Sequence, residues 1–233
     1  MNSSTDTPRV VTYDIEATNL KASFGYCLCF GYKELGWKKA KVISVLDYPA
    51  HKNDPTNDAH LMRAAHDILT NHADIIVSYY GKGFDRKFLN TRMLAAGLRP
   101  LPPLSHEHID LYYTAKHNLA LHSNRLASVS EFLGTADRKT PLDGQTWVRA
   151  SAGHRPSIRY VIDHCKADVE VLEQCYLKLR PFIRQHPRIG TVFQCRNCGT
   201  AKFQYRGYGI TKSGGRSRRR VCMTCGSWSE VKA

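Results

Sequence analysis

The sequence lacks any apolar run approaching the roughly 20 residues that span a membrane. Its polar start, residues 1–8, also lacks the apolar core of a signal peptide. These absences predict an intracellular protein, cytoplasmic or nucleoid-associated, without a membrane partner. Acidic residues are scarce too, because 20 Asp and Glu stand against 34 Lys and Arg, a formal net charge of +14 at pH 7. This imbalance favours a polyanionic partner, above all a nucleic acid.

The basic excess is concentrated at the C-terminal end of the chain. Residues 191–233 hold nine Lys and Arg against one acid, and four of the eight cysteines lie there in two C-x-x-C hooks. Four thiolates with this spacing are typical of a closed, structural zinc site in a zinc ribbon. Two disulfides are the alternative, which a chain without secretory features disfavours. We therefore predict a domain at 1–187 and a zinc ribbon at 188–233 that binds one structural Zn²⁺ through Cys195, Cys198, Cys222 and Cys225.

Basic and aromatic residues alternate between the two hooks. Aromatic rings can stack on unpaired bases while arginines neutralise phosphates, which holds single strands without sequence readout. Alternatively, the aromatic residues fill the small core of the ribbon and the basic run is a solvated hairpin. A third interpretation is that the ribbon recruits a protein partner. The predicted nucleic-acid-binding residues are Lys202, Tyr205, Arg206, Arg216, Arg218, Arg219 and Arg220.

Two carboxylates, Asp14 and Glu16, follow the apolar run at 10–13. Alternate residues of a strand share a face, so these side chains would stand about 6–7 Å apart. A hard divalent cation such as Mg²⁺ or Mn²⁺ would relieve their repulsion and leave coordination positions for a phosphate. The alternative is that this tripeptide is a solvated turn at the end of a strand.

Two later segments carry further candidate residues. Asp85 follows an apolar strand pattern and a glycine-punctuated turn, near the start of a helix, where an acid can also be a simple N-terminal cap. His164 and Asp168 are four residues apart in a helical pattern and therefore share a face. Without other observations, such a pair is more often a surface or packing contact than a catalytic one.

Taken in chain order, these segments resemble the motifs of the DEDD superfamily of 3′-to-5′ exonucleases. The region between the second and third motifs is similar to that in exonuclease domains of family B DNA polymerases and their stand-alone relatives. The resemblance covers about residues 9–182. The matching positions are Asp14-x-Glu16 for motif I, Tyr80-Gly81-x-x-Phe84-Asp85 for motif II, His164-x-x-x-Asp168 for motif III, and, between II and III, Ile109-Asp110-Leu111, Arg125-Leu126-x-x-Val129-x-x-Phe132-Leu133-Gly134 and Lys139.

The resemblance implies an RNase H-like α/β fold, with a mixed sheet flanked by helices. It also implies a two-metal-ion 3′-to-5′ exonuclease that acts on single-stranded DNA or frayed 3′ ends, with DNA favoured over RNA. Asp14 would bridge two Mg²⁺ or Mn²⁺ ions, Glu16 and Asp168 would complete the site that activates water, and Asp85 would hold the second ion. His164 would orient or deprotonate the attacking water.

The chain departs from the family pattern at two positions. Tyr80 stands where relatives usually have Asn, and His164 has the spacing from Asp168 that belongs to the family's Tyr branch. Two other functions stay open at this point: a structure-selective endonuclease on the same fold, and a non-catalytic nucleic-acid or protein adaptor that uses the ribbon.

Hydrophobic periodicity and turn residues predict the order of the elements. The predicted strands are 9–15, 24–32, 40–47 and 74–79, with a short extended piece at 107–110; the predicted helices are 57–72, 84–96, 111–118, 123–133 and 157–185; residues 135–156 are predicted to form a loop.

Overall fold

The computed structural model describes residues 7–103, 107–135 and 142–232. Lys139, one of the positions that match the exonuclease family, lies outside the described residues. The chain divides into two compact units, one from Arg9 to Cys175 and the other from Tyr176 onward. The domain boundary expected near residue 187 stays a prediction, and the two units are described separately.

The first unit is built on a five-stranded mixed sheet in the order β3-β2-β1-β4-β5. β1 pairs with β2 and β2 with β3 in antiparallel fashion, whereas β4 runs parallel to both β1 and β5. The register of β1 with β4 covers only Val10 to Thr12, so the end of β1 continues past the shorter strand. The strands are β1 (Val10–Ala17), β2 (Cys27–Glu34), β3 (Lys41–Ser44), β4 (Ile75–Ser78) and β5 (His108–Asp110).

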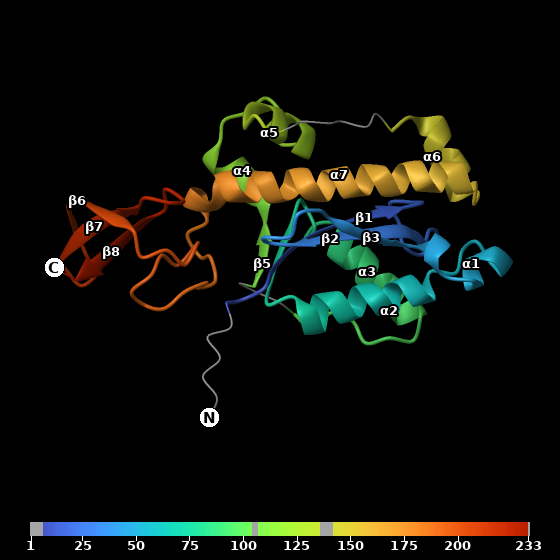
Figure 1. The fold of residues 1–233 in the computed structure, drawn as a ribbon, viewed down its shortest axis with the longest axis horizontal. Coiled ribbons are helices and arrows are strands. Elements are labelled where there is room, and N and C mark those ends of the chain that lie inside the picture. Colours follow the sequence, from blue (N-terminus) through green and yellow to red (C-terminus); the bar gives the residue numbers. More distant parts are fainter. Residues whose placement is uncertain (1–6, 104–106, 136–141, 233) are drawn as a thin grey trace. The chain divides into compact units, whose positions relative to one another are not determined.

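Helices cover both faces of this sheet (Figure 1). α2 (Ala59–Asp67) and α3 (Asp85–Ala95) lie on one face, and α7 (Arg155–Leu179) runs along the other. Buried residues of all three helices join one hydrophobic core with the strands, which confirms the expected α/β fold class. Among the described residues, no helix is both long and apolar enough to cross a membrane. The shorter helices are α1 (Ala50–Asn53), α4 (Leu111–Asn118), α5 (Leu126–Phe132) and α6 (Gly144–Ser151).

Several predicted elements differ from the structure, among them β3, which ends at Ser44 instead of 47. β1 runs to Ala17, so Asp14 and Glu16 lie inside a strand and the solvated-turn alternative is wrong. The predicted loop at 135–156 is wrong over α6, where the Asp143 carboxylate caps the helix by accepting the Thr146 backbone N–H at 2.6 Å. The last predicted helix ends at Leu179 instead of 185, because a proline at 181 disfavours α-helical backbone at the residue before it.

The second unit contains a three-stranded antiparallel sheet in the order β6-β7-β8. One C-x-x-C hook precedes β6 and the other spans the end of β7 and the turn before β8. The strands are β6 (Phe203–Ile210), β7 (Arg216–Cys222) and β8 (Trp228–Lys232).

Candidate active site

The carboxylates of Asp14 and Glu16 lie on the same face of β1, the face that α7 covers. Cys165 of α7 lies behind Asp14, with its Sγ 3.8 Å from the Asp14 carbonyl oxygen. One carboxylate oxygen of Glu16, one of Asp168 and a ring nitrogen of His164 all lie within 4.8 Å of one another. Residues 148 to 152 positions apart in the sequence thus meet where the central strand crosses the long helix.

His164 faces the acids of both elements. Its Nε2 is 3.5 Å from Oδ2 of Asp168 on the same helix and 3.9 Å from Oε1 of Glu16 on β1. Its Nδ1 is buried and has no hydrogen-bond partner among the described residues. The predicted shared face of His164 and Asp168 is confirmed, and it is turned toward the carboxylates of β1.

Asp85 is the first residue of α3, and Phe84 occupies the cap position. Its side chain is buried, at 5% exposure. Backbone N–H groups of Asp85 itself and of Ile15 donate to its carboxylate. Asp85 is therefore fastened to the part of β1 that extends beyond β4, between Asp14 and Glu16.

All five predicted catalytic residues line one open cavity of about 880 Å³. Two lysines, Lys21 and Lys87, and the aromatic residues Tyr79 and Tyr80 also line it. The lining residues come from β1 and the loop after it, the turn before α3, α3 itself and α7. The five predicted residues are Asp14, Glu16, Asp85, His164 and Asp168.

Burial is the first cause that raises the pKa of all four carboxyl groups, and neighbouring acids of the site add to it for Asp14 and Glu16. Burial, followed by the charge of Asp168 and then of Asp85, raises the pKa of Glu16 to about 8. Burial also raises the pKa of Asp85 to about 7, although backbone N–H donors act against it. The pKa values of Asp14 and Asp168 are raised as well, first by burial in both cases, and for Asp14 also by the three other acids. This crowding of anionic oxygens fits a site for hard divalent cations, which would neutralise them.

We expect the melting temperature without added divalent cations to fall as the pH rises from about 4.5 to about 8. Glu16 and Asp85 have raised pKa values in the folded protein, so the folded state binds more protons in this window than the unfolded state. Stability is therefore lost with rising pH. Mg²⁺ should flatten the dependence, and so should Glu16→Gln, which removes one titrating group. A melting temperature equally insensitive to pH with and without Mg²⁺ would contradict the assigned cluster.

Sequence reasoning missed the role of Asp110 in shaping the site. Its buried carboxylate accepts backbone N–H groups of Tyr80 at 2.8 Å, Lys82 at 3.0 Å and Tyr112 at 3.1 Å. Two of these donors lie in the turn that joins β4 to α3 and so positions Asp85. The only signal in the sequence was the match of Ile109-Asp110-Leu111 to the exonuclease family.

Tyr80 in the same turn has a left-handed backbone, with φ of 62°. It is the only residue other than glycine with positive φ among those the structure describes. This conformation costs an L-residue about 1–2 kcal/mol. The sequence placed Tyr80 in motif II as an exception, and the structure adds that its backbone is strained there.

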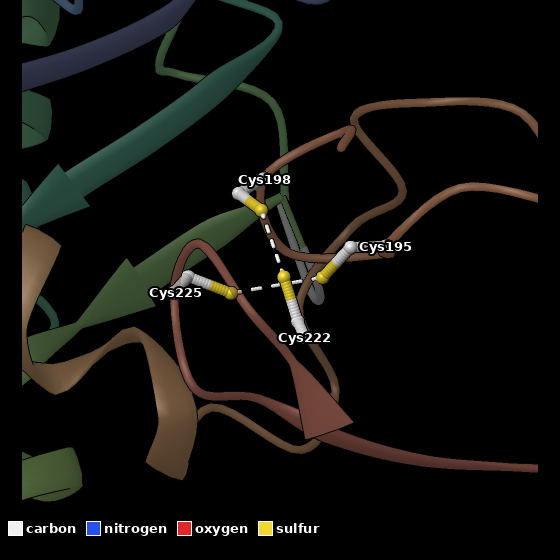
Figure 2. A group of neighbouring side chains, drawn as sticks. All are labelled: Cys195, Cys198, Cys222 and Cys225. Atoms are coloured by element: carbon white, nitrogen blue, oxygen red, sulfur yellow. Dashed lines mark hydrogen bonds between the residues drawn. The ribbon is translucent and has the colours of Figure 1, made fainter. Parts of the chain in front are cut away.

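The four cysteines of the two hooks converge in the second unit (Figure 2). The Sγ atoms of Cys195 and Cys225 are 3.6 Å apart, as are those of Cys198 and Cys222. Four sulfurs bound tetrahedrally to zinc at about 2.3 Å would be separated by about 3.8 Å, so the cluster fits that ion. Burial raises the pKa of Cys222, but backbone N–H groups of Cys225 and Thr224 and neighbouring thiols outweigh it and lower the pKa to about 7. Burial raises the pKa of Cys195 and Cys198 instead, so of these three thiols Cys222 forms the thiolate that a metal requires most readily.

Three arginines of β7 stack on three aromatic rings of β6. Guanidinium carbons of Arg216, Arg218 and Arg220 lie 3.9, 4.1 and 3.8 Å from the ring centres of Tyr208, Tyr205 and Phe203 respectively. We call these six residues the arginine–aromatic ladder. Tyr205 and Tyr208 are about half exposed, at 48% and 53%, so for them the alternative of a core role is wrong.

A β-bulge brings the two tyrosines to one face of the ribbon. Tyr205 and Tyr208 are three residues apart, which would put them on opposite faces of a regular strand. The pairing of β6 with β7 shifts between them, and Gly207 there has φ of +69°, a value that glycine adopts without strain. The remaining predicted binding residues lie off the ladder: Arg219 pairs with Glu230 at 3.6 Å on the opposite face, Arg206 donates to Gln204, and Lys202 precedes β6.

Comparisons with known proteins agree with this fold. A family model described as the RNase H superfamily matches residues 11–180. Among solved structures, the chain is similar to the family B DNA polymerase from the hyperthermophilic archaeon Pyrobaculum calidifontis, with a TM-score of 0.56 and 18% sequence identity. The match covers 78% of this chain and 27% of the polymerase, so the chain spans about a quarter of that protein's length. No curated protein sequence matches.

Proposed function

Because the chain belongs to the RNase H superfamily, we propose that it is a metal-dependent 3′-to-5′ exonuclease that hydrolyses phosphodiester bonds of single-stranded DNA or frayed 3′ ends. The observation that carries this proposal is the single cavity lined by four carboxylates and one imidazole from three separate segments. Superfamily membership and the polymerase-like fold support a nuclease acting on nucleic acid. The 3′-to-5′ direction rests on the ordered resemblance of the three motifs to DEDD exonucleases.

In this proposal the four carboxylates, Asp14, Glu16, Asp85 and Asp168, hold two Mg²⁺ or Mn²⁺ ions. When bound, such ions lower the pKa of a water molecule and stabilise the leaving 3′ oxygen. The Nε2 of His164, beside Glu16 and Asp168, would accept the proton of the attacking water. Lys21 and Lys87 contribute positive charge to a cavity that must admit a phosphate.

The test of this proposal is digestion of DNA and RNA oligonucleotides labelled at the 3′ or the 5′ end, with added Mg²⁺ or Mn²⁺. A 3′-to-5′ exonuclease releases the 3′ label at once as a mononucleotide and shortens 5′-labelled strands stepwise. DNA should be degraded faster than RNA. Cleavage of circular single-stranded DNA would instead identify an endonuclease, and tight binding without metal-dependent degradation would identify an adaptor.

The arginine–aromatic ladder supplies a second nucleic-acid contact in the proposal. Each guanidinium rests one face on a ring and keeps N–H donors for phosphate oxygens, while the half-exposed rings of Tyr205 and Tyr208 offer surfaces for bases. Lys202 and Arg206 add positive charge to β6 and the segment before it, whereas Arg219 pairs with Glu230 on the opposite face. A closed four-cysteine zinc site would have the structural role of fixing the hook beside β7.

Replacing Arg216, Arg218 and Arg220 together with alanine should weaken binding of single-stranded DNA and make it less sensitive to salt. Each lost phosphate contact lowers the slope of log K against log salt by about 0.7, so the slope should fall by about 2. The matched control is Arg219→Ala, because Arg219 already pairs with Glu230 on the other face. Fluorescence anisotropy titrations at several salt concentrations measure the affinity and its salt dependence. Equal slopes for the triple variant and the wild type would remove the ladder from the binding surface.

A further inference from the structure

Three hydrogen bonds hold the strained backbone of Tyr80. The Asp110 carboxylate accepts its N–H, and its carbonyl oxygen accepts the N–H groups of Gly83 at 2.9 Å and Phe84 at 3.0 Å. Backbone strain that survives because the surroundings over-determine it clusters at ligand clamps and active sites. These contacts fix the direction in which the Tyr80 ring leaves the turn.

The turn also provides room for the ring. A Cβ atom added to Gly83 would lie 2.4–2.8 Å from three atoms of the Tyr80 ring, so the ring lies directly over this glycine. The ring of Tyr112 meets it edge-on with centres 4.8 Å apart, and Tyr113 lies 6.3 Å away. The Tyr80 ring is therefore supported by Gly83 under one of its faces and by Tyr112 at its side.

The ring is nevertheless 44% exposed, and it lines the same cavity as the four carboxylates. Tyr80 is not a core residue, since a buried tyrosine would need a hydrogen-bond partner for its hydroxyl. A surface tyrosine without a function would not need a strained backbone. An aromatic ring that is fixed in position and open to an anion-binding cavity has the properties of a stacking platform for a base. Lys87 and Lys21 line the same cavity, and their charges favour the phosphates attached to that base.

We propose that the Tyr80 ring stacks on the unpaired base of the 3′-terminal nucleotide and so positions the terminal phosphodiester at the carboxylates. This inference rests on the proposed function and names the subsite that receives the terminal base. Tyr80 is a positioning residue, because it touches the base and no reacting atom. Stacking of this kind accepts any base, because every base has a π-face, so the subsite does not depend on sequence.

The test measures binding in the full chain carrying Asp14→Ala, so that the oligonucleotide is not degraded. A single-stranded DNA oligonucleotide is used with either a normal or an abasic 3′-terminal nucleotide. Tyr80→Asn removes the ring but suits the turn, because asparagine is enriched in left-handed backbone. We expect it to weaken binding of the normal oligonucleotide about 5- to 150-fold, the range for base–aromatic stacking, and to leave binding of the abasic one unchanged. Tyr80→Phe, which keeps the ring, should bind both as the parent does.

The abasic arm separates stacking from a merely structural role. A variant that only distorted the turn would weaken both oligonucleotides alike, and that result would overturn the inference. Equal binding of normal and abasic ends by the parent would overturn it too. Because this is a binding measurement, it can succeed even if no metal-dependent degradation is found, which would reject the proposed exonuclease and leave a terminal-base site.

Discussion

Asp14→Ala should lower the rate of metal-dependent degradation by about 10⁴-fold or more. Asp14 lies on the central strand of the sheet, and burial, followed by the charges of Glu16, Asp85 and Asp168, raises its pKa. Catalytic groups that act as one unit lose most of their effect when any single member is removed. Release of a 3′ label from single-stranded DNA, with wild type and variant at equal concentration, measures the change.

Asp163→Ala is the matched control. Asp163 is an exposed acid on α7, next to His164 in the sequence but absent from the residues that line the cavity. It removes the same charge from the same unit, so its activity should stay within a few-fold of wild type. Equal degradation by wild type and Asp14→Ala would show that the cavity is not where hydrolysis occurs.

Cys198→Ser should release the metal of the second unit, from one zinc ion per chain to almost none. Structural zinc contributes about 10–16 kcal/mol to small zinc domains, far more than a short three-stranded sheet gains from its own core. The arginines of β7 should then become accessible to trypsin, since a protease needs the strand unpaired. Elemental analysis of the purified protein and a digestion time course measure both effects.

Cys175→Ala serves as the control for this substitution. Cys175 is a buried thiol outside the cluster, so its loss should leave the zinc content at one per chain and the β7 arginines protected. Retention of stoichiometric zinc by Cys198→Ser, or an absence of zinc from the wild type, would argue against a four-thiolate zinc site.

The features that could be predicted from the sequence are those set by short-range geometry. Alternation along a strand placed Asp14 and Glu16 on one face, and a four-residue helical interval did the same for His164 and Asp168. The two C-x-x-C hooks also predicted a metal site, because a tight turn between the two cysteines of a hook brings both thiols to one ion. In each case the spacing in the chain nearly determines the spacing in space.

The features that could not be predicted depend on distant partners or on a single irregular residue. No residue near Lys33 in the sequence indicates that it forms a buried ion pair with Glu173, 140 residues away. The anchoring of the turn at Tyr80 by Asp110 likewise joins segments 30 residues apart. The ion pair of Arg219 with Glu230 likewise joins two different strands. Hydrophobic periodicity carries no information about such pairings.

Cys222 of the metal cluster lies two residues after Arg220 in β7, so its position determines which face of the strand carries Arg216, Arg218 and Arg220. Since successive side chains of a strand alternate, these four residues share one side of β7, while Ser217 and Arg219 face Glu230. With Cys222 fixed by the hook, inserting one residue after Arg220 would turn all three arginines to the Glu230 side and scatter the ladder. Inserting two would restore their side. A one-residue change in the length of this strand would therefore need a compensating bulge to keep the arginines on their face, a constraint that no single substitution would reveal.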